Sequence, residues 1–472
     1  MPRLRLLLMA LGFALCSLGV AEIKAEVFLA NGIKIGEVDS NSAIVWTRLT
    51  QFSDRNLKGL SWGDNESLPA GKSLEEMEYS VPGARGDVKV DWWLEGVRVG
   101  GSGWGAVDPQ KDFTSQIKLS DLLPDQEYRV AVYSRTPDGA PGQTIKGRFR
   151  TAPSENEAEP VRFTVVSCQE FSRRDDKPNG HTIYSTMLDV DPDFFVHTGD
   201  IVYYDYKRSN PKARNSELAR YKWNRMYSLP YQKAFHNQVS SYFIKDDHDT
   251  VKNDSTPGDR YGDLTWDQGL WIFREQVPMG KETYRTVRWG KDLQIWLVEG
   301  RDFRSPNDAP DGPEKTIWGE EQKQWFFESV KKSDATFRIL ISPTPVVGPD
   351  RGNKFDNHAN VNFSHEGNEI RTFISKQRNM FVICGDRHWQ YVSQDTETGV
   401  REYACGSASD QHAGGYSEDR RTPMHEYLKV RGGFLSVQIK RENGRAQAVL
   451  THHGVDGQVL NRDVLEAETV ED

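Results

Sequence analysis

Short runs of apolar residues recur along the chain after residue 160, and each run ends in polar or charged residues. Their apolar residues are continuous rather than alternating, which is typical of strands buried on both faces of a sheet. Segments of helix length separate the runs, and residues 319–333 carry an apolar side at helical spacing. The pattern predicts a layered α/β domain with strands at 161–168, 193–200, 241–249, 293–302, 337–345 and 380–388.

Before residue 152 the hydrophobic pattern is different. Apolar and polar residues alternate in 42–50 and 128–135, as in antiparallel strands with one exposed face. Residues 122–128 (LLPDQEY) resemble the Leu-x-Pro-x-x-x-Tyr corner of fibronectin-III-like sandwiches, whose tyrosine bonds to nearby backbone. We therefore expect an all-β, immunoglobulin- or fibronectin-III-like sandwich at 26–152, a polar linker, and the α/β domain at 160–465.

The amino terminus has the pattern of an export signal. Two arginines precede an apolar run at 6–20, and small residues follow it. The run is short for a membrane span, so we interpret 1–25 as a signal peptide that is cleaved after Ala21 or Ala25. No later segment is apolar enough to cross a bilayer. The sequence therefore predicts a secreted or periplasmic protein with no transmembrane segment after cleavage.

Composition narrows the class of partner. The formal net charge is −9, from 60 Lys and Arg against 69 Asp and Glu, which argues against a general nucleic-acid or anionic-membrane binder. Three cysteines remain outside the signal, and an odd number leaves at least one thiol unpaired or bound to something else. Cys384 and Cys405 are expected either to form a disulfide or to remain as buried free thiols.

Potential metal ligands follow four of the apolar runs. In layered α/β folds ligands bind beyond the carboxyl ends of strands, and crowded carboxylates repel one another unless a cation lies among them. Taken singly, each motif has a simpler interpretation as a helix cap, a solvated loop or a buried structural cysteine. Their coincidence at four strand ends indicates a single site. The candidates are Cys168, Asp200, Tyr203, Asp247, His248, Asn253, Asp386 and His388.

The donor types indicate which cations such a site would hold. A thiolate such as that of Cys168 stays deprotonated beside acidic groups only if a cation holds it. The Tyr203 phenolate suits a hard trivalent ion such as Fe(III), and the two oxygens of Asp200 allow it to bridge two cations. Thiolate and phenolate favour a redox-capable transition metal, whereas an amide with carboxylates favours a hard cation.

These motifs resemble those of the calcineurin-like metallophosphoesterase superfamily and, within it, the alkaline phosphatase D family. The matching stretches are SCQ at 167–169, GDIVY at 199–203, DDHD at 246–249 and GDRH at 385–388, with further similarity in AIVWTRL (43–49), VEGRDFR (298–304) and GEEQKQW (319–325). Two positions depart from the family. Lys245 takes a place often held by Trp, and Glu299-Gly300 replaces the usual Asp-Thr.

The resemblance implies a four-layer α/β/β/α metallophosphoesterase domain after the sandwich. It also implies a dinuclear site for Fe(III) together with Ca(II) or another divalent cation. Cys168, Asp200, Tyr203 and Asp386 would surround the iron, with Asp200 bridging. Asp247, Asn253 and His388 would serve the second cation.

The catalytic groups would be His248, as proton donor to the leaving group, together with Asp200 and Arg301. Asp249 or Asp246 would fix the tautomer of His248. The guanidinium groups of Arg301 and Arg304 match phosphate oxygens, although packing or an ion pair explains each about equally well. The long polar loop at 342–367 holds His358, which we expect to face the substrate.

The sequence thus predicts an exported hydrolase, a metal-dependent phosphatase or phosphodiesterase, that cleaves a small phosphorylated substrate by metal-activated hydroxide. One alternative is hydrolysis of a sulfate, phosphonate or phospholipid ester on the same metals. Another is a non-catalytic protein that binds a metal or ligand. Retention of every motif argues against the latter, since a degenerate site should have lost at least one ligand.

Overall fold

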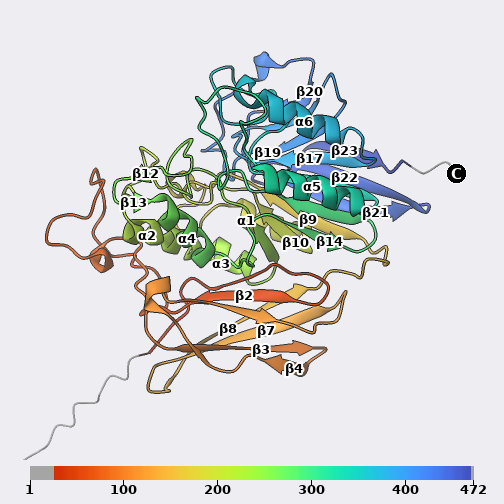
Figure 1. Ribbon diagram of the computed structural model, residues 1–472. Coiled ribbons are helices and arrows are strands. Elements are labelled where there is room, and N and C mark those ends of the chain that lie inside the picture. Colours follow the sequence, from red (N-terminus) through yellow and green to blue (C-terminus); the bar gives the residue numbers. More distant parts are fainter. Residues whose placement is uncertain (1–25, 469–472) are drawn as a thin grey trace, which may run out of the picture.

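Two sheets packed face to face form the centre of the computed structural model, which describes residues 26–468 (Figure 1). Each predicted apolar run of the α/β domain forms a strand. These strands are β9 (Val161–Val166), β10 (Phe194–His197), β11 (Ser240–Phe243), β15 (Leu293–Leu297), β16 (Phe337–Ser342) and β17 (Met380–Cys384). The first three are parallel neighbours in one sheet and the last three in the other.

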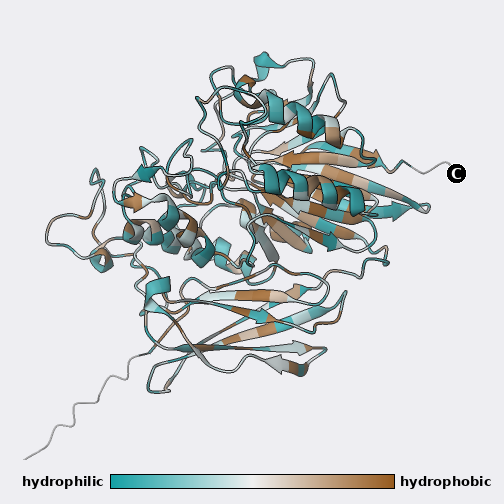
Figure 2. Ribbon diagram, in the orientation of Figure 1, coloured by the Kyte–Doolittle hydropathy of each residue, from teal (hydrophilic) through white to brown (hydrophobic). Residues whose placement is uncertain are grey.

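The continuous apolar runs follow from burial of both faces of each strand. In β10, Phe194 and Val196 point into the core between the two sheets, while Phe195 points to the helices outside. Because side chains alternate along a strand, a strand covered on both faces needs apolar residues at successive positions. Figure 2 shows apolar residues concentrated in the strands and polar residues on the outer helices.

Helices cover the outer face of each sheet. One sheet is covered by α1 (Ile183–Val190), α2 (Ser216–Tyr227), α3 (Pro230–His236) and α4 (Trp266–Gln276). The other is covered by α5 (Glu320–Lys332) and α6 (Ser364–Ile374). The predicted helix at 319–333 is α5, and its Phe326 and Val330 are buried against the sheet. The four-layer α/β/β/α arrangement is therefore confirmed.

The remaining strands complete the two sheets. The sheet that contains β9 also receives β21 (Phe434–Glu442), β22 (Arg445–His453) and β23 (Val459–Glu466). The sheet that contains β15 also receives β14 (Arg285–Trp289), β18 (Gln390–Gln394), β19 (Arg401–Cys405) and β20 (His425–Lys429). A separate short hairpin consists of β12 (Arg260–Tyr261) and β13 (Leu264–Thr265).

The amino-terminal region is a β-sandwich, as predicted. One side consists of β1 (Ile33–Gly36), β2 (Ala43–Arg48) and β6 (Thr114–Leu119), and the other of β3 (Asp87–Leu94), β4 (Val97–Gly101), β5 (Gly105–Ala106), β7 (Glu127–Arg135) and β8 (Pro141–Arg150). Tyr128 is buried in its core, and its hydroxyl accepts a hydrogen bond from the backbone N of Leu123 at 2.8 Å. The tyrosine corner expected from the sequence is therefore present.

The sandwich and the α/β domain share a sheet, which the sequence pattern does not indicate. β1 pairs in parallel with β11 at Gly36 and Ser241, so that β1, β2 and β6 extend this sheet to nine strands among the described residues. Lys34 lies on the same strand, and its Nζ donates to the backbone O of Gln276 at 2.7 Å. The two regions are therefore joined by backbone pairing as well as by side chains.

Two further expectations concern the termini and the membrane. The predicted signal peptide at 1–25 lies outside the described residues. Between residues 26 and 468 no helix has the length and apolar character needed to span a bilayer.

We predict that Gly36→Ala weakens the junction between the sandwich and the α/β domain. A Cβ at this position would lie 2.4 Å from the backbone O of Ser241 and 2.6 Å from Pro278, closer than atoms can approach. Overpacking of this kind costs roughly 1–3 kcal/mol. The midpoint of urea unfolding should fall accordingly. Gly105→Ala, where a Cβ would meet no atom within 4 Å, is the matched control and should leave the midpoint unchanged. Equal midpoints for the two variants would contradict the prediction.

Candidate metal centre

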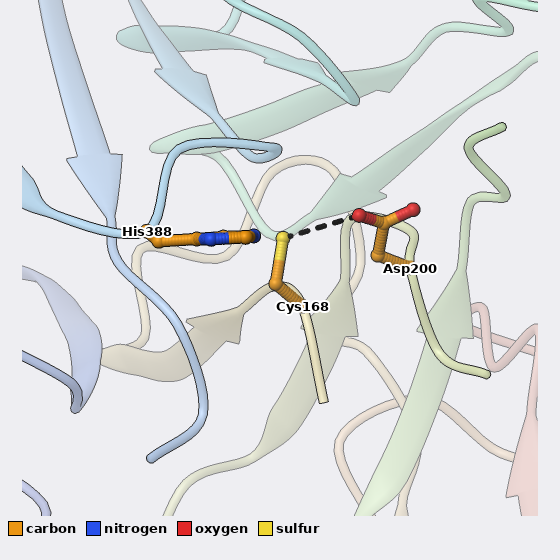
Figure 3. A group of neighbouring side chains, drawn as sticks. All are labelled: Cys168, Asp200 and His388. Carbon is orange, nitrogen blue, oxygen red and sulfur yellow. Dashed lines mark hydrogen bonds between the residues drawn. The ribbon is translucent and has the colours of Figure 1, made fainter. Parts of the chain in front are cut away.

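The carboxyl ends of β9, β10, β11 and β17 meet at one edge of the packed sheets. The two sheets are tied together there, because the backbone N of Asp386 donates to Ser167 Oγ at 3.0 Å. Three groups of side chains have possible ligand atoms within 4.8 Å of one another. They are Cys168, Asp200 and His388 (Figure 3); Asp200, Asp247 and His248; and Asp200, Asp246 and Asp386. Asp200 belongs to all three groups and is therefore the centre of the cluster.

Three of the strand-end residues have an unusual backbone conformation. Cys168, Asp200 and Asp386 have φ of 53°, 55° and 61°, in the left-handed region that residues with a Cβ rarely adopt. Gly199 precedes Asp200 with φ of 108°, and a Cβ there would lie 2.6 Å from Cβ of Asp246. Such conformations cost of order 1–3 kcal/mol each and persist where the surrounding structure enforces them, often at functional sites.

One half of the cluster surrounds Asp200 Oδ2 with a phenol and a thiol. The Tyr203 hydroxyl donates to this oxygen at 2.8 Å, and Cys168 Sγ lies 3.4 Å from it. His388 Nε2 lies 3.4 Å from the Tyr203 hydroxyl. Figure 3 shows Cys168 Sγ between the His388 ring and the Asp200 carboxylate. The four side chains offer sulfur, oxygen and nitrogen donors to one position.

Burial makes the negatively charged forms of these groups unfavourable unless a cation is bound. It raises the pKa of Asp200, Cys168 and Tyr203 well above their usual values, and neighbouring negative charges act in the same direction. A bound cation reverses such shifts and favours the deprotonated forms. Asp200 Oδ1 is buried and has no hydrogen-bond partner among residues 26–468, so it is free to accept a ligand bond.

The other half of the cluster is rich in carboxylates. Burial opposes ionisation of Asp247, but the charges of Arg301 and His248 outweigh it and lower the pKa of Asp247. Asp246 Oδ1 accepts from Arg301 Nε at 2.5 Å, whereas its buried Oδ2 has no hydrogen-bond partner within the described chain. Asp246 is thus a further candidate ligand, which the sequence analysis treated only as support for His248.

The grouping of Asp386 and His388 differs from the one that the resemblance implies. His388 was expected beside the second cation, yet it lies with Cys168 and Tyr203. Asp386 was expected beside the iron, yet its possible ligand atom lies with those of Asp246 and Asp200. Each of these two side chains therefore lies on the half of the cluster where the other was expected.

His248 is held by Asp205, a residue that the sequence analysis missed. Asp205 Oδ1 lies 2.5 Å from His248 Nδ1, and Asp205 Oδ2 accepts from the backbone N of Asn253 at 2.8 Å. The tautomer expectation for Asp246 and Asp249 is wrong. Asp249 instead accepts from the backbone N of Ile201 and of Asp246. The signal was present in the sequence, because Asp205 closes the same GDIVYYD stretch that supplied Asp200 and Tyr203.

The charges around His248 favour its imidazolium form. Burial lowers its pKa, but the carboxylates of Asp247, Asp205 and Asp200 outweigh burial and raise the pKa well above the usual value. The side chain is 16% exposed, so it reaches the surface of the cluster. A protonated imidazole in this position can donate a proton or a hydrogen bond to a bound ligand.

The other predicted site residues have varied surroundings. Asn253 is exposed and contacts the cluster through its backbone N. Arg301 is fully buried behind Asp246, and Arg304 donates from Nη2 to Asn307 Oδ1 and to the backbone O of Asp356.

His358 does not join the cluster. Within the described chain it is buried, with Nε2 2.9 Å from Glu366 Oε2 and its ring edge-on to Trp318.

One further residue beside the cluster was not anticipated. His412 lies beside the thiol and imidazole half, with its ring centroid 4.0 Å from that of His388 and its Nδ1 2.9 Å from the backbone O of Cys168. It comes from a polar loop after β19, outside the pattern of apolar runs, so nothing in that pattern marked it. Cys384 and Cys405 are buried free thiols, which settles the alternative left open by the sequence.

Comparisons with known proteins identify the chain's relatives. The family model described as PhoD-like phosphatase matches residues 163–456. Alkaline phosphatase D of Bacillus subtilis (strain 168) is 21% identical over 478 residues, which cover 88% of this chain and 75% of that protein. A solved structure of PhoD matches with a TM-score of 0.72 at 15% identity, over 94% of this chain and 93% of that chain.

The fold is also similar to that of a purple acid phosphatase of lower sequence identity. Purple acid phosphatase PPD1 from yellow lupin (Lupinus luteus) seeds matches with a TM-score of 0.61 at 11% identity, over 92% of this chain and 74% of that chain. At this identity the match concerns the fold alone. It places both the sandwich and the layered α/β domain within an arrangement that known phosphatases share.

We predict that Asp205→Asn lowers the pKa of His248 in metal-free protein. The substitution keeps a hydrogen-bond acceptor but removes one of the negative charges that raise this pKa. NMR titration of ring-labelled histidine, assigned with a His248→Gln variant, measures the change. Asp259→Asn, which removes a charge paired with Lys252 at 3.2 Å, should leave the titration of His248 unaltered. An unchanged His248 titration in Asp205→Asn would show that Asp205 does not control its protonation.

Proposed function

The chain belongs to the PhoD-like phosphatase family, and we propose that it is an exported phosphoesterase acting on phosphomonoesters, phosphodiesters or both at the candidate metal centre. Family membership makes it a phosphoric ester hydrolase. The observation that carries the assignment to this centre is the position of Asp200. Its ligand atoms belong to three groups of closely spaced donors, and one of its oxygens is buried without a hydrogen-bond partner in the described chain.

The residues present fit two cations that share Asp200. Cys168, Tyr203 and His388 would hold one cation together with Asp200, and the thiol and phenol suit Fe(III). Asp246, Asp247 and Asp386 would hold the other, and this all-oxygen set suits Ca(II) or another hard divalent ion. The amide of Asn253 remains a candidate for the second cation. When bound, such cations activate a water molecule as nucleophile and neutralise charge on the phosphate.

His248 is proposed as the group that assists departure of the alcohol. Hydrolysis breaks the bond between phosphorus and the ester oxygen, and that oxygen needs a proton as it leaves. Asp205 orients the imidazole through Nδ1, which leaves Nε2 available to donate. The raised pKa of His248 favours the protonated form that this role requires.

Arg301 is proposed to act on the carboxylates rather than on the substrate. It is fully buried, its Nε bonds to Asp246, and its Nη2 lies 3.9 Å from Asp247 Oδ2. A fixed positive charge behind two adjacent carboxylates reduces their mutual repulsion and sets the direction of their free oxygens. Arg304 is also buried, and its charge interacts favourably with Asp246 and Asp247.

Export is proposed from the amino-terminal pattern alone. Residues 1–25 would direct the chain to the periplasm or out of the cell. The substrate is proposed to be a small phosphorylated molecule that reaches the centre from solvent.

Asp200→Asn should abolish turnover of 4-nitrophenyl phosphate and bis(4-nitrophenyl) phosphate. Loss of the charge at the centre of the cluster should reduce kcat/KM by more than the ~10–100-fold that outer-shell changes around metals cost. Asp267→Asn, an exposed aspartate on α4, is the control and should retain activity. Circular dichroism would verify that both variants fold. Full activity in folded Asp200→Asn would overturn the proposal.

Protein as purified should contain iron and show a visible absorption band from its thiolate or phenolate ligand. Elemental analysis and the absorption spectrum measure both properties. Tyr203→Phe should shift or remove any phenolate contribution while the fold is retained, and Tyr231→Phe, a residue of α3 outside the cluster, should leave the spectrum unaltered. A colourless, iron-free enzyme with full activity would refute the assigned iron ligands.

A further inference from the structure

Lys354 places a positive charge beside the carboxylate half of the cluster. Its Nζ lies 3.1 Å from Asp254 Oδ1 and 3.2 Å from Asp356 Oδ2. The backbone N of Asp254 in turn donates to Asp247 Oδ2 at 2.5 Å. The ammonium group is therefore one residue removed from a candidate metal ligand. It belongs to the polar loop between β16 and α6, from which the sequence predicted His358 as the substrate-facing residue.

Within residues 26–468, Lys354 is a basic side chain on the carboxylate half that solvent can reach. Among the described residues, four Lys and Arg side chains have charges that interact with the carboxylate half: Arg301, Arg304, Arg387 and Lys354. Arg351 acts on His388, in the other half. Arg301 and Arg387 are 0% exposed and Arg304 is 3% exposed, whereas the Lys354 side chain is 19% exposed. This exposure is close to that of His248, the proposed proton donor. On the carboxylate half, a substrate from solvent can therefore reach Lys354, whereas the three arginines there are buried.

The carboxylates that pair with Lys354 are also compensated by other groups or by water. Asp356 also lies 3.5 Å from Arg387 Nη2, and its charge is further compensated by Arg301 and Arg304. The Asp254 side chain is 34% exposed, so water can solvate its carboxylate. The ammonium group can therefore turn from these carboxylates to another anion without leaving a buried charge unpaired.

The form of the substrate decides what an additional cation contributes. A phosphomonoester carries about −1.5 to −2 charge near neutral pH, because its second pKa is about 6. A phosphodiester carries a single negative charge and has one fewer unesterified oxygen. A lysine beside the centre therefore has a stronger interaction with the monoester, and charge-assisted hydrogen bonds to phosphate are among the strong ones.

We propose that Lys354 binds an unesterified oxygen of the substrate phosphate and gives the enzyme a preference for monoesters over diesters. This inference rests on the proposed function, whose site it extends by a residue that contacts substrate. Lys354 makes this contact from the polar loop between β16 and α6, and His248 faces the leaving group.

Lys354→Met removes the charge at nearly constant length, and Lys354→Arg retains the charge. Lys323→Met is the matched control. Lys323 is also partly buried between two carboxylates, Glu369 at 2.9 Å and Glu320 at 3.5 Å, but it lies on α5. Each variant is assayed with 4-nitrophenyl phosphate and bis(4-nitrophenyl) phosphate. The Kd of inorganic phosphate for the metal-loaded protein is measured by calorimetry, and the unfolding midpoint is recorded.

Lys354→Met should lower kcat/KM for the monoester by about 10–100-fold, which is what loss of a charge-assisted hydrogen bond costs. The loss for the diester should be several-fold smaller, and the Kd of phosphate should rise by about 10-fold or more. Lys354→Arg should retain most of the kcat/KM for the monoester and most of the affinity for phosphate. Lys323→Met should alter neither quantity.

Equal losses for the two esters with an unchanged Kd of phosphate would overturn the proposal and leave Lys354 a structural ion pair. If the unaltered protein hydrolyses neither ester, the proposed function fails. The Kd of phosphate then still decides whether Lys354 binds the anion.

Discussion

Repulsion among buried carboxylates is the constraint on which the rest of the site depends. Asp200, Asp246, Asp247, Asp249 and Asp386 converge at one edge of the sheets, and all are largely shielded from water. Two like charges in a medium of low dielectric constant cannot both remain ionised without compensation. The protein supplies part of it through Arg301, Arg387 and His248, each of which has its pKa raised by the surrounding carboxylates. Asp200 Oδ1 and Asp246 Oδ2 remain unpaired within the described chain and are available to a cation at the candidate metal centre.

The strand ends keep this cluster together by means of backbone geometry. Parallel strands end at the same edge, so β9, β10 and β11 bring their last residues close to one another, and the Ser167–Asp386 hydrogen bond adds β17 from the other sheet. Cys168, Asp200 and Asp386 adopt the left-handed conformation at the positions from which their side chains enter the cluster. These conformations cost free energy, and burial of the apolar strands that precede them offsets this cost. The site therefore lies at the ends of strands that are apolar on both faces.

Much of this arrangement could be predicted from the sequence, because it follows from local pattern. Continuous apolar runs identify buried strands, and polar residues after them identify the edge. The placement of Asp386 and His388 on different halves of the cluster could not be predicted in this way. Residues two apart on an extended strand point to the same side, but φ of 61° at Asp386 breaks that alternation and directs the two side chains to different halves of the cluster. His412 and the pairing of β1 with β11 depend on contacts across some two hundred residues, which no local pattern contains.

One ion pair links Lys245 and Glu299, which lie at the two positions that depart from the family pattern. Lys245 and Glu299 form a buried ion pair, with Asp302 2.7 Å from the same ammonium group. Without Lys245 the carboxylate of Glu299 would be buried and lack a positive partner, which costs about 3–5 kcal/mol, whereas Lys245 without Glu299 would retain Asp302. Glu299 Oε1 also accepts from the backbone N of Arg301 at 2.7 Å, and Lys245 precedes Asp246 in the chain. The pair therefore fixes both ends of the Arg301–Asp246 interaction. Two positions far apart in the sequence thus support one element of the site, the orientation of the carboxylates of the candidate metal centre.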